Sequence, residues 1–321
     1  MALTLLKQVR SACKAVTERA LQVRINYELI AAYAASLSVE KASRPGHDPQ
    51  SHYLRRDEDT AAFFLILDSI NFGSGYFPHL KKRPGRSGYF TVASCLNDRF
   101  RKQGPLSASE LARLTAEECT IIFEQEPDNQ TIGELMQLFA KALNDLGWYL
   151  EQDFNGSFTG LIEAAGASAE RMVHLLIRMP YFYDVEAYDS LEVPFYKRAQ
   201  LTAADLSLAF GNEGLGKFDD LHDLTIFADN LVPHVLRVDK ILLYAEDLVS
   251  RINTGNLIPA GSAEEIEIRA GALHAVELLK AEMHSSGYPM TAMELDFLLW
   301  NRGQQPAYKS IARHRTRTVF Y

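Results

Sequence analysis

The chain has 321 residues, 47% of them hydrophobic and 23% charged, a balance typical of a water-soluble globular protein with enough core for one large domain or two small ones. Its formal net charge of −8 argues against a broad grip on a nucleic-acid backbone, which requires a basic surface. The three cysteines are odd in number and far apart, which predicts reduced thiols and neither a disulfide framework nor a zinc site: Cys13, Cys95 and Cys119.

Two features of the chain bear on its location. The stretch from Met1 to Val16 is a poor signal peptide because Lys7 and Arg10 interrupt its apolar run. No apolar run along the chain reaches the length that is needed to span a membrane. We therefore expect a cytoplasmic protein that has no membrane partner.

Taken in order, the first hundred residues alternate helical stretches with loops. Residues 5–37 carry helical periodicity with a break, and residues 39–56 are polar and proline-containing, which predicts a surface loop. Asp59, or the threonine after it, then opens the strongly apolar helix AAFFLILDSINF. Residues 73–88 are rich in Gly, Pro and basic residues, so we expect a loop there, with a short hairpin running into residues 89–92.

Helix start signals repeat along the rest of the chain. A Ser or Thr followed three residues later by Glu forms a capping box, which satisfies unpaired N–H groups at a helix start. Such pairs precede apolar helical runs at Ser107–Glu110, Thr115–Glu118, Thr131–Glu134, Ser262–Glu265 and Thr291–Glu294. Thr202 and Asp205 make a weaker version, and the best strand candidate, residues 181–193, is short and irregular. The pattern predicts an all-α protein with at most a minor β-hairpin, folded as a single multi-helix domain over residues 1–321.

Two polar residues interrupt the apolar helix that ends near residue 72. Asp68 and Asn71 lie one helical turn apart, and Phe72 and a glycine break follow them. Asp68 can be a buried acid that a neighbouring helix satisfies, with Gly73 as the residue that ends the helix. Equally, Asp68 and Asn71 can hydrogen-bond a planar polar ligand on which Phe72 stacks. Both interpretations suit the residue types.

Charged residues stand beside aromatic or apolar ones at two later positions. Lys197 and Arg198 follow Phe-Tyr at the start of a helical run. Adjacent basic residues are usually a solvated helix face, but at a helix start they can hold a phosphate. Asp296 lies in the apolar run LDFLLW and must have a partner, because an unpaired buried charge is costly. That partner can be a ligand or an arginine.

The stretch from residue 218 to residue 237, FDDLHDLTIFADNLVPHVLR, gathers four aspartates and two histidines around one short apolar run. The spacing of Leu221–Ala228 predicts a short buried helix, and Val232-Pro233 opens the next one, since proline suits a first helical turn. Asp229 therefore faces the unpaired N–H groups of a helix start, where it can be an ordinary cap. Because it follows an apolar run, it can also lie at the bottom of a cleft and stabilise a developing positive charge.

The sequence lacks the common motifs of other catalytic and cofactor-binding sites. The sequence has no G-x-G-x-x-G after a strand, no P-loop, no H-E-x-x-H and no G-x-S-x-G. Its nine histidines show no compact metal-ligand spacing, and the glycine-rich GNEGLG follows a helix and predicts a helix–helix turn. We therefore expect neither a metal nor a cofactor.

Five blocks, in this order, together carry a family resemblance: LDSINFGSGYF, FYKRAQL, LTIFADNLVPHVLR, EIEIRA and LDFLLWNRG. Over roughly residues 56–303 the chain resembles the queuosine salvage protein family, which consists of queuosine 5′-phosphate N-glycosylases. The resemblance implies an all-helical fold related to that of the helix-hairpin-helix DNA glycosylases. Asp229, followed in the next helix by Arg237, resembles the DNA glycosylase pattern. The Leu-Pro-Gly-x-Gly hairpin that clamps DNA is replaced by the acidic GLGKFDDLHDL, which favours a free nucleotide as substrate.

The resemblance implies hydrolysis of the N-glycosidic bond in queuosine 5′-monophosphate, with release of the 7-deazaguanine base queuine and no cofactor. Asp229 would stabilise or capture the oxocarbenium-like ribose, as nucleophile, general base or electrostatic stabiliser. The expected base-binding residues are Asp68, Asn71, Phe72, Asp296 and Trp300, and the expected phosphate-binding residues are Lys197, Arg198 and, more weakly, His52.

The expected partners are the small-molecule substrate and product alone, without a nucleic-acid polymer. Two other classes of function stay open on the residues themselves. A DNA-repair-type glycosylase would need a basic groove, which the net charge of −8 disfavours. A non-enzymatic nucleotide-binding helical module would bind ligand without any catalysis by Asp229.

Overall fold

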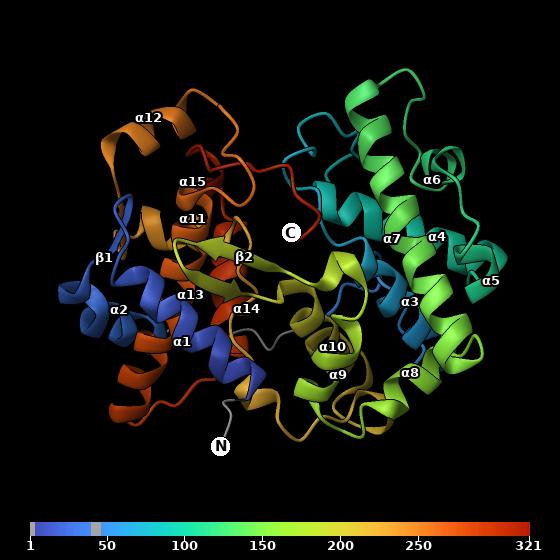
Figure 1. Cartoon of the computed structure of the whole chain (residues 1–321), viewed down its shortest axis with the longest axis horizontal. Coiled ribbons are helices and arrows are strands. Elements are labelled where there is room, and N and C mark those ends of the chain that lie inside the picture. The colour runs from blue at the N-terminus through green and yellow to red at the C-terminus, as the bar shows by residue number, and fades with distance from the viewer. Residues whose placement is uncertain (1–3, 40–45) are drawn as a thin grey trace. The chain divides into compact units, whose positions relative to one another are not determined.

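The structure, a computed structural model, describes residues 4–39 and 46–321 (Figure 1). Helices predominate, and the strands of the described residues form two small antiparallel pairs, so the predicted all-α class is confirmed. The chain divides into two compact units, each built from segments that are distant in sequence. The first unit contains residues 1–45, 184–197 and 221–317, and the second contains residues 46–183, 198–220 and 318–321. Folding as a single domain over residues 1–321, and the likeness to DNA glycosylases, stay predictions.

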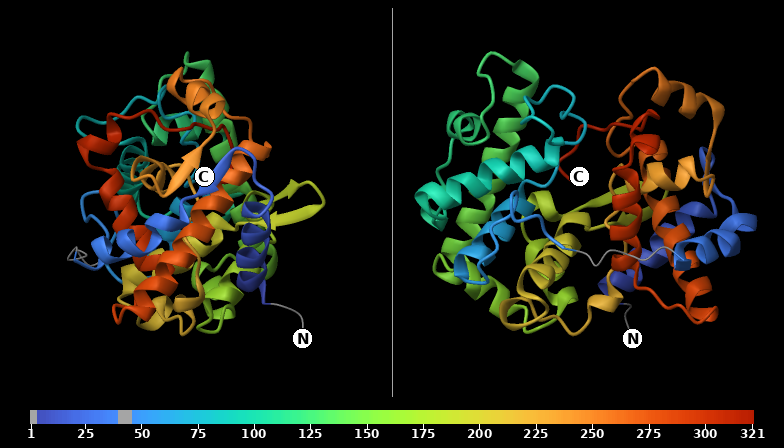
Figure 2. Two further views of the ribbon diagram at one scale, coloured as in Figure 1. Left: turned by 90° about the vertical axis from the view of Figure 1, so that its left-hand side faces the viewer. Right: turned by 180° about the vertical axis from the view of Figure 1, so that it is seen from behind.

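The first unit is organised around the long helix α13 (Ala263–Ser285), which packs against helices from both ends of the chain and against β1 and β4. Figure 2 shows these elements from two further sides. The other helices of this unit are α1 (Leu5–Thr17), α2 (Tyr27–Val39), η3 (Leu221–Asp223), α11 (Val232–Val238), α12 (Glu246–Asn253), α14 (Ala292–Gly303) and α15 (Pro306–Lys309). Its strands are β1 (Val23–Ile25) with β4 (Leu242–Tyr244), and β2 (Val185–Tyr188) with β3 (Leu191–Pro194).

The second unit is organised around α7 (Gln130–Phe154), which packs against α3, α5, α6 and α8. Gly147 permits the close approach of α5, since a Cβ atom there would lie 2.3 Å from the main-chain nitrogen of Ala112. The remaining helices are α3 (Glu58–Ser69), α4 (Gly88–Gln103), α5 (Ala108–Leu111), α6 (Ala116–Ile122), α8 (Phe158–Ala164), α9 (Ala169–Leu176), η1 (Pro180–Phe182), α10 (Lys197–Phe210) and η2 (Gly214–Gly216).

The capping-box predictions are confirmed where no competing cap lies nearby. Ser107, Thr115 and Thr291 form complete boxes, and Ser262 caps α13 by accepting from the Glu265 N–H. The prediction for Thr131 is wrong because the Asn129 side chain caps α7 first, accepting from the Ile132 N–H. Thr202 is also not a cap. It lies inside α10, where its hydroxyl donates to the Arg198 carbonyl at 2.9 Å.

Three local predictions need correction, two of them for loops and one for a helix. Residues 89–92 lie in α4 and not in a hairpin, because the Ser87 side chain caps that helix. Of residues 221–228, only the first three form a short 3-10 helix. Within the predicted surface loop of residues 39–56, residues 40–45 lie outside the described part, and Ser51, His52 and Tyr53 are buried.

Two local predictions hold. The break inside residues 5–37 is β1, which pairs with β4, and residues 181–193 hold most of the hairpin β2–β3, in which Tyr188 pairs with Leu191. The three cysteines are free and buried, as expected of reduced thiols. No helix in the described part of the chain is long and apolar enough to cross a membrane.

One buried carboxylate joins α13 to the start of the chain. Glu267 accepts hydrogen bonds from the main-chain N–H groups of Leu21, Gln22 and Val23 at 3.1, 2.6 and 2.9 Å. The Tyr188 hydroxyl donates to Oε1, the oxygen that also accepts from Leu21, at 2.8 Å. One acid thereby satisfies donors from three elements, because β1 would otherwise begin with unpaired N–H groups.

We expect Glu267→Gln to lower the free energy of unfolding by about 1–3 kcal/mol, because the neutral amide turns two donors toward groups that are themselves donors. The urea midpoint of unfolding, followed by circular dichroism, measures this effect. Glu282→Gln, on a partly exposed position of the same helix, is the control and should leave the midpoint unchanged. Equal midpoints for both variants would contradict the anchoring role.

Candidate active site

Asp229 lies between an irregular buried segment and a helix. Leu224–Ala228 has no regular secondary structure and is buried, and Asp229 is half-buried just before α11. Its Oδ1 atom accepts from the N–H groups of Leu231 at 2.7 Å and Val232 at 3.2 Å. Among the described residues, no donor hydrogen-bonds its Oδ2 atom. Leu231 is the N-cap of α11, and Asp229 lies two residues before it, with one oxygen fixed by main-chain N–H groups and the other left available.

Side chains from two helices hold the main chain just before Asp229. Asp296 of α14 accepts from the Phe227 N–H at 2.9 Å, and Arg269 of α13 donates from Nε to the Ala228 carbonyl at 3.0 Å. These two bonds satisfy main-chain groups that a helix would otherwise pair internally. This explains why the segment is not the predicted helix, and it fixes the approach of the chain to Asp229.

Arg269 is part of a buried ion pair. Its Nη1 and Nη2 atoms contact the two carboxylate oxygens of Asp184 at 3.0 and 2.6 Å, in the bidentate geometry that guanidinium and carboxylate favour. Glu265 adds a second carboxylate at 3.5 Å, and the Phe195 ring lies 3.9 Å below the guanidinium. Both members of the pair are fully enclosed, with Arg269 0% and Asp184 2% exposed.

Lys197 begins α10 and is buried. Its main-chain N–H donates to Asp184 Oδ2 at 3.1 Å. Tyr196, directly before it, has a φ of 50°, a left-handed conformation that non-glycine residues seldom adopt outside constrained sites. Contacts with Asp184 therefore fix the conformation of the turn that leads to Lys197.

On α14, Asp296 and Trp300 lie four residues apart and so share one helix face. Asp296 is buried and reaches the segment before Asp229, and Trp300 is partly exposed one turn further on. Asp296 therefore has a main-chain partner in addition to any ligand. The sequence allows a ligand or an arginine as the partner of this acid, and in the structure the Phe227 N–H is one of its partners.

Three residues around Asp229 were missed from the sequence: Asp184, Arg269 and Arg313. Desolvation lowers the pKa of the Arg313 guanidinium, and the nearby Asp229 carboxylate acts in the opposite direction. Arg269 belongs to the block EIEIRA, where three charged residues in a run of apolar ones were a usable signal. Asp184 and Arg313 stand in stretches without such a pattern.

In the second unit, Arg198 is enclosed by main-chain and aromatic groups. Its guanidinium donates to the carbonyls of Asp68 at 3.1 Å and Ser69 at 2.6 Å, and also to that of Tyr181. The rings of Phe72 and Phe182 lie 4.9 and 4.5 Å from it. Arg198 therefore closes the C-terminal end of α3, a role that differs from the predicted phosphate contact.

Asp68, Asn71 and Phe72 lie at that same end of α3. Asp68 is the last acid of the helix and is fully buried, and Phe72 packs edge-on against Phe139 with ring centroids 5.2 Å apart. Asn71 is only partly buried. Predicted base contacts are thus adjacent in space, and the contact of Phe72 with Arg198 gives this ring a packing function as well.

His52 lies in the loop that precedes α3 and is buried. Its Nδ1 atom faces the Asp48 main chain at 3.1 Å, its Nε2 atom faces the Tyr89 hydroxyl at 2.9 Å, and its ring stacks on Phe64. Burial and the neighbouring His47 lower the pKa of His52 to about 3. The ring is therefore neutral near pH 7, and both of its nitrogens already have hydrogen-bond partners within the protein.

The predicted residues fall into two groups by unit. Asp229, Asp296, Trp300 and Lys197 belong to the first, and the second contains Asp68, Asn71, Phe72, Arg198 and His52. In the described part of the chain, no group of three or more His, Cys, Asp or Glu side chains is arranged to hold a metal ion.

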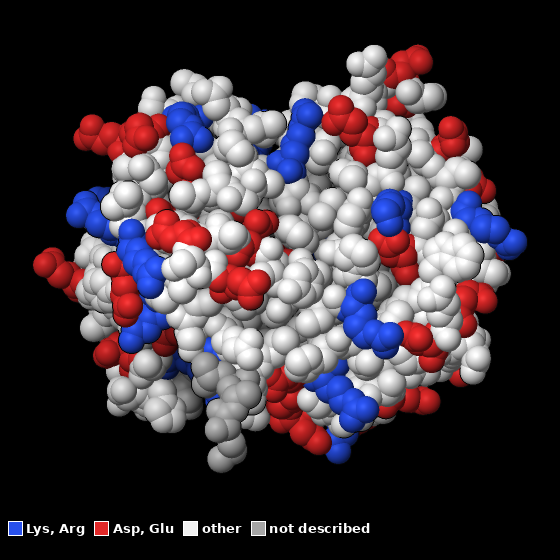
Figure 3. Space-filling model, viewed as in Figure 1, with Lys and Arg blue, Asp and Glu red and all other residues white. Residues whose placement is uncertain are grey.

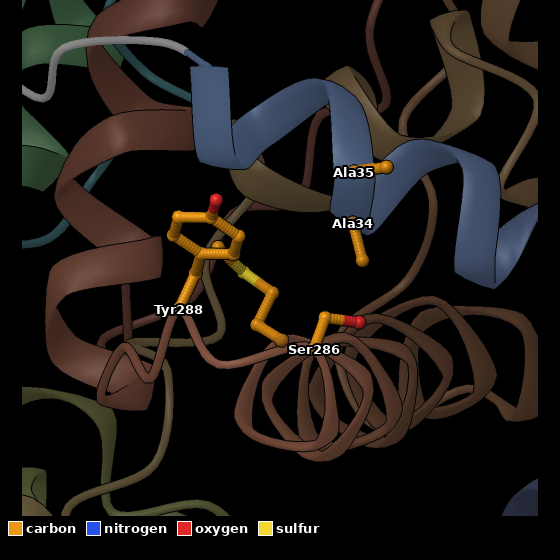
Figure 4. A pocket seen from close by; sticks show the side chains of 5 residues that line it. Ala34, Ala35, Ser286 and Tyr288 are labelled. Atoms are coloured by element: carbon orange, nitrogen blue, oxygen red, sulfur yellow. The ribbon is translucent and has the colours of Figure 1, made fainter.

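A small pocket in the first unit contains none of these residues. It has a volume of about 80 Å³ and is lined by Ala34, Ala35, Met283, Ser286 and Tyr288. In Figure 4, Ser286 and Tyr288 lie opposite the α2 residues Ala34 and Ala35. The lining is almost wholly apolar and offers no acid or base for catalysis.

Three buried histidines predict acid lability. Burial lowers the pKa of His52 and His314 to about 3 and of His234 to about 4, and arginines near the last two act in the same direction. In the unfolded chain each ring takes up its proton near pH 6.5. Between about pH 6.5 and 4 the unfolded state therefore binds more protons, so stability falls as the pH falls, by up to about 1.4 kcal/mol per pH unit for each histidine.

Urea unfolding at pH 7, 6 and 5 measures this dependence. His314→Gln should make it less steep, and the exposed control His222→Gln should leave it unchanged. A free energy of unfolding that is constant from pH 7 to pH 5 would contradict the neutral state of these rings.

Comparison with known proteins identifies the family. Residues 51–321 match the family described as queuosine salvage protein. A protein of Sphaerobacter thermophilus named queuosine 5′-phosphate N-glycosylase/hydrolase is 36% identical over 318 residues, covering 98% of this chain and 97% of that protein. Proteins of the same name from Dictyostelium discoideum and Mus musculus are 33% and 28% identical, covering 82% and 83% of this chain and 79% and 83% of their own lengths. The chain belongs to the queuosine salvage protein family.

Proposed function

We propose that this protein hydrolyses the N-glycosidic bond of queuosine 5′-monophosphate and releases queuine. The relative from Sphaerobacter thermophilus, which bears the name of this activity, matches the chain at 36% identity over nearly the full length of both proteins. The observation in the structure that supports the proposal most directly is the Asp229 carboxylate, with one oxygen fixed and one left available.

The reaction requires a negative charge at the ribose. As the glycosidic bond breaks, positive charge develops on the sugar, as in other glycosyl transfers through an oxocarbenium-like state. The N–H groups of Leu231 and Val232 hold Asp229 Oδ1, which orients the carboxylate before the substrate arrives. Asp229 then stabilises the charge, captures the sugar or activates water. Such a hydrolysis needs no redox or group-carrying cofactor and no metal.

The leaving base needs help from the protein. Queuine is a 7-deaza base, so it lacks the N7 atom whose protonation assists the departure of purines. Hydrogen bonds to the rest of the ring system must take over that function. Asp296 and Trp300, on the same face of α14, are our candidates in the first unit. Asp68, Asn71 and Phe72 at the end of α3 are those in the second unit.

Lys197 is our principal candidate for binding the 5′-phosphate. It is the first residue of α10, and the N-terminus of a helix favours an anion. Arg198 already directs donors at three main-chain carbonyls and His52 is neutral, so these two are weaker candidates for the phosphate than Lys197. Energy from binding the remote phosphate can hold the ribose against Asp229.

We also propose that the substrate is the free nucleotide and not a nucleic-acid polymer, and that the enzyme acts in the cytoplasm. On the face shown in Figure 3, Lys and Arg side chains are interspersed with Asp and Glu and do not merge into a basic surface. Together with the net charge of −8, this disfavours tracking of a phosphate backbone.

Asp229→Asn should lower kcat for base release from queuosine 5′-monophosphate by about 100-fold or more, since the amide oxygen still accepts from the N–H groups of Leu231 and Val232 but the charge is lost. Chromatographic detection of free queuine measures the rate, and Asp247→Asn, an exposed acid at the start of α12, is the control. Full activity of Asp229→Asn would move the chemistry to another residue. No release by folded wild-type protein would favour a nucleotide-binding module, and release of bases from DNA would favour a repair-type glycosylase.

Lys197→Met should raise KM for the nucleotide about tenfold or more while changing kcat/KM for unphosphorylated queuosine much less, because only the nucleotide carries the 5′-phosphate. Methionine preserves the apolar stem of the side chain and removes the charge. The same chromatographic assay, run with both substrates, gives the two values. Equal losses on the two substrates would contradict a phosphate-binding role.

A further inference from the structure

One buried ion pair contacts the main chain of Lys197 and of Ala228, the residue before Asp229. Arg269 Nε donates to the carbonyl of Ala228, the residue before Asp229, at 3.0 Å. Asp184 Oδ2 accepts from the N–H of Lys197 at 3.1 Å. Arg269 and Asp184 are themselves joined by contacts of 3.0 and 2.6 Å. The chain of bonds therefore runs from Ala228 to Lys197 through only two side chains.

Asp184 also hydrogen-bonds the residues directly before Lys197. The Asp184 carbonyl accepts from the N–H groups of Phe195 at 2.9 Å and Tyr196 at 3.4 Å. The Phe195 ring in turn lies 3.9 Å from the Arg269 guanidinium. A displacement of the ion pair would therefore also move residues 195–197, because main-chain hydrogen bonds and the Phe195 ring join them to the pair.

The burial of this pair is hard to explain by stability alone. An enclosed ion pair loses the hydration of both charges, and apolar residues of similar volume often stabilise a core as well or better. What such a pair does provide is direction, since a planar guanidinium bound to a carboxylate by two bonds holds both groups in one orientation. In that orientation the third donor group of Arg269, Nε, hydrogen-bonds the Ala228 carbonyl.

We infer that Arg269 and Asp184 are positioning residues for the reaction, which set the distance between the catalytic carboxylate of Asp229 and the phosphate-binding Lys197. The inference rests on the proposed function of both residues. A substrate that is anchored at its phosphate presents its ribose to Asp229 only if this distance is correct. A misplacement of about 1 Å can lower a rate by about 100-fold.

The test uses a ratio that does not depend on how much of a sample is correctly folded. For each variant, kcat/KM for queuosine 5′-monophosphate is divided by kcat/KM for queuosine, measured on the same preparation. A variant that is only less stable reduces both values equally. A variant in which Lys197 and Asp229 are displaced from each other loses the advantage of the phosphate, so the ratio falls.

Arg269→Lys keeps the charge and removes the bidentate contact and the Nε donor, and Asp184→Asn keeps the shape and removes the charge. We expect each substitution to lower the ratio about tenfold. Phe195→Leu leaves both charged residues in place and removes only the ring below the guanidinium. Phe195→Leu is the milder change, so it should fold even if Arg269→Lys and Asp184→Asn do not. It should also lower the ratio, by a smaller factor.

Glu267→Gln is the matched control. Glu267 is a buried acid two residues from Arg269 on α13, but it binds residues 21–23 and Tyr188 and not the Asp229 segment. Its ratio should equal that of wild type even though the variant is less stable. A ratio that falls equally in this control would show that any loss in the core has the same effect, and would overturn the inference.

The remaining outcomes separate the inference from the proposed function. Wild-type ratios in every variant of the pair that folds and in Phe195→Leu, with activity still lost in Asp229→Asn, would overturn the positioning role and leave the proposed function intact. A wild-type protein without base release would overturn both.

Discussion

The cost of burying charge on α13 organises the first unit. Glu265, Glu267 and Arg269 are enclosed in one stretch of this helix, and an enclosed charge is tolerated only with partners. Glu267 obtains them from the main chain of residues 21–23 and from Tyr188. Arg269 obtains them from Asp184 and from the carbonyl before Asp229. The start of the chain, the β2–β3 hairpin and the Asp229 segment are therefore all fixed to the same helix.

The segment before Asp229 shows how this arrangement replaces secondary structure. Its residues are apolar and buried, which is why their spacing predicted a helix. A helix would satisfy its main-chain groups internally, whereas here Asp296 and Arg269 satisfy the N–H of Phe227 and the carbonyl of Ala228 from outside. Local propensity could not reveal this, because both partners come from helices that are distant in sequence. The same side chains hold the segment in an irregular course that leads to Asp229.

The success of the sequence predictions follows the range of the interactions that they use. The all-α class, three of the capping boxes and the placement of Asp229 before α11 were predictable because they depend on neighbours within a few residues. The Asp184–Arg269 pair joins residues that are 85 positions apart, and neither has a local signal of its partner. Arg198 shows the same limit. Its hydrogen bonds to the carbonyls at the end of α3 and to Tyr181 join it to residues far away in the sequence, and its phosphate contact stays a prediction.

The placement of Arg269 suits the proposed chemistry better than a direct salt bridge to Asp229 would. A guanidinium bound to the catalytic carboxylate would neutralise the charge that the developing cation on the ribose requires. Arg269 instead binds the carbonyl of the preceding residue, and its own charge is compensated by Asp184 and Glu265. Asp229 itself is oriented by main-chain N–H groups, which carry only partial charges. The segment is thereby held rigidly by a cation whose field is largely cancelled, and the carboxylate remains able to act on the substrate.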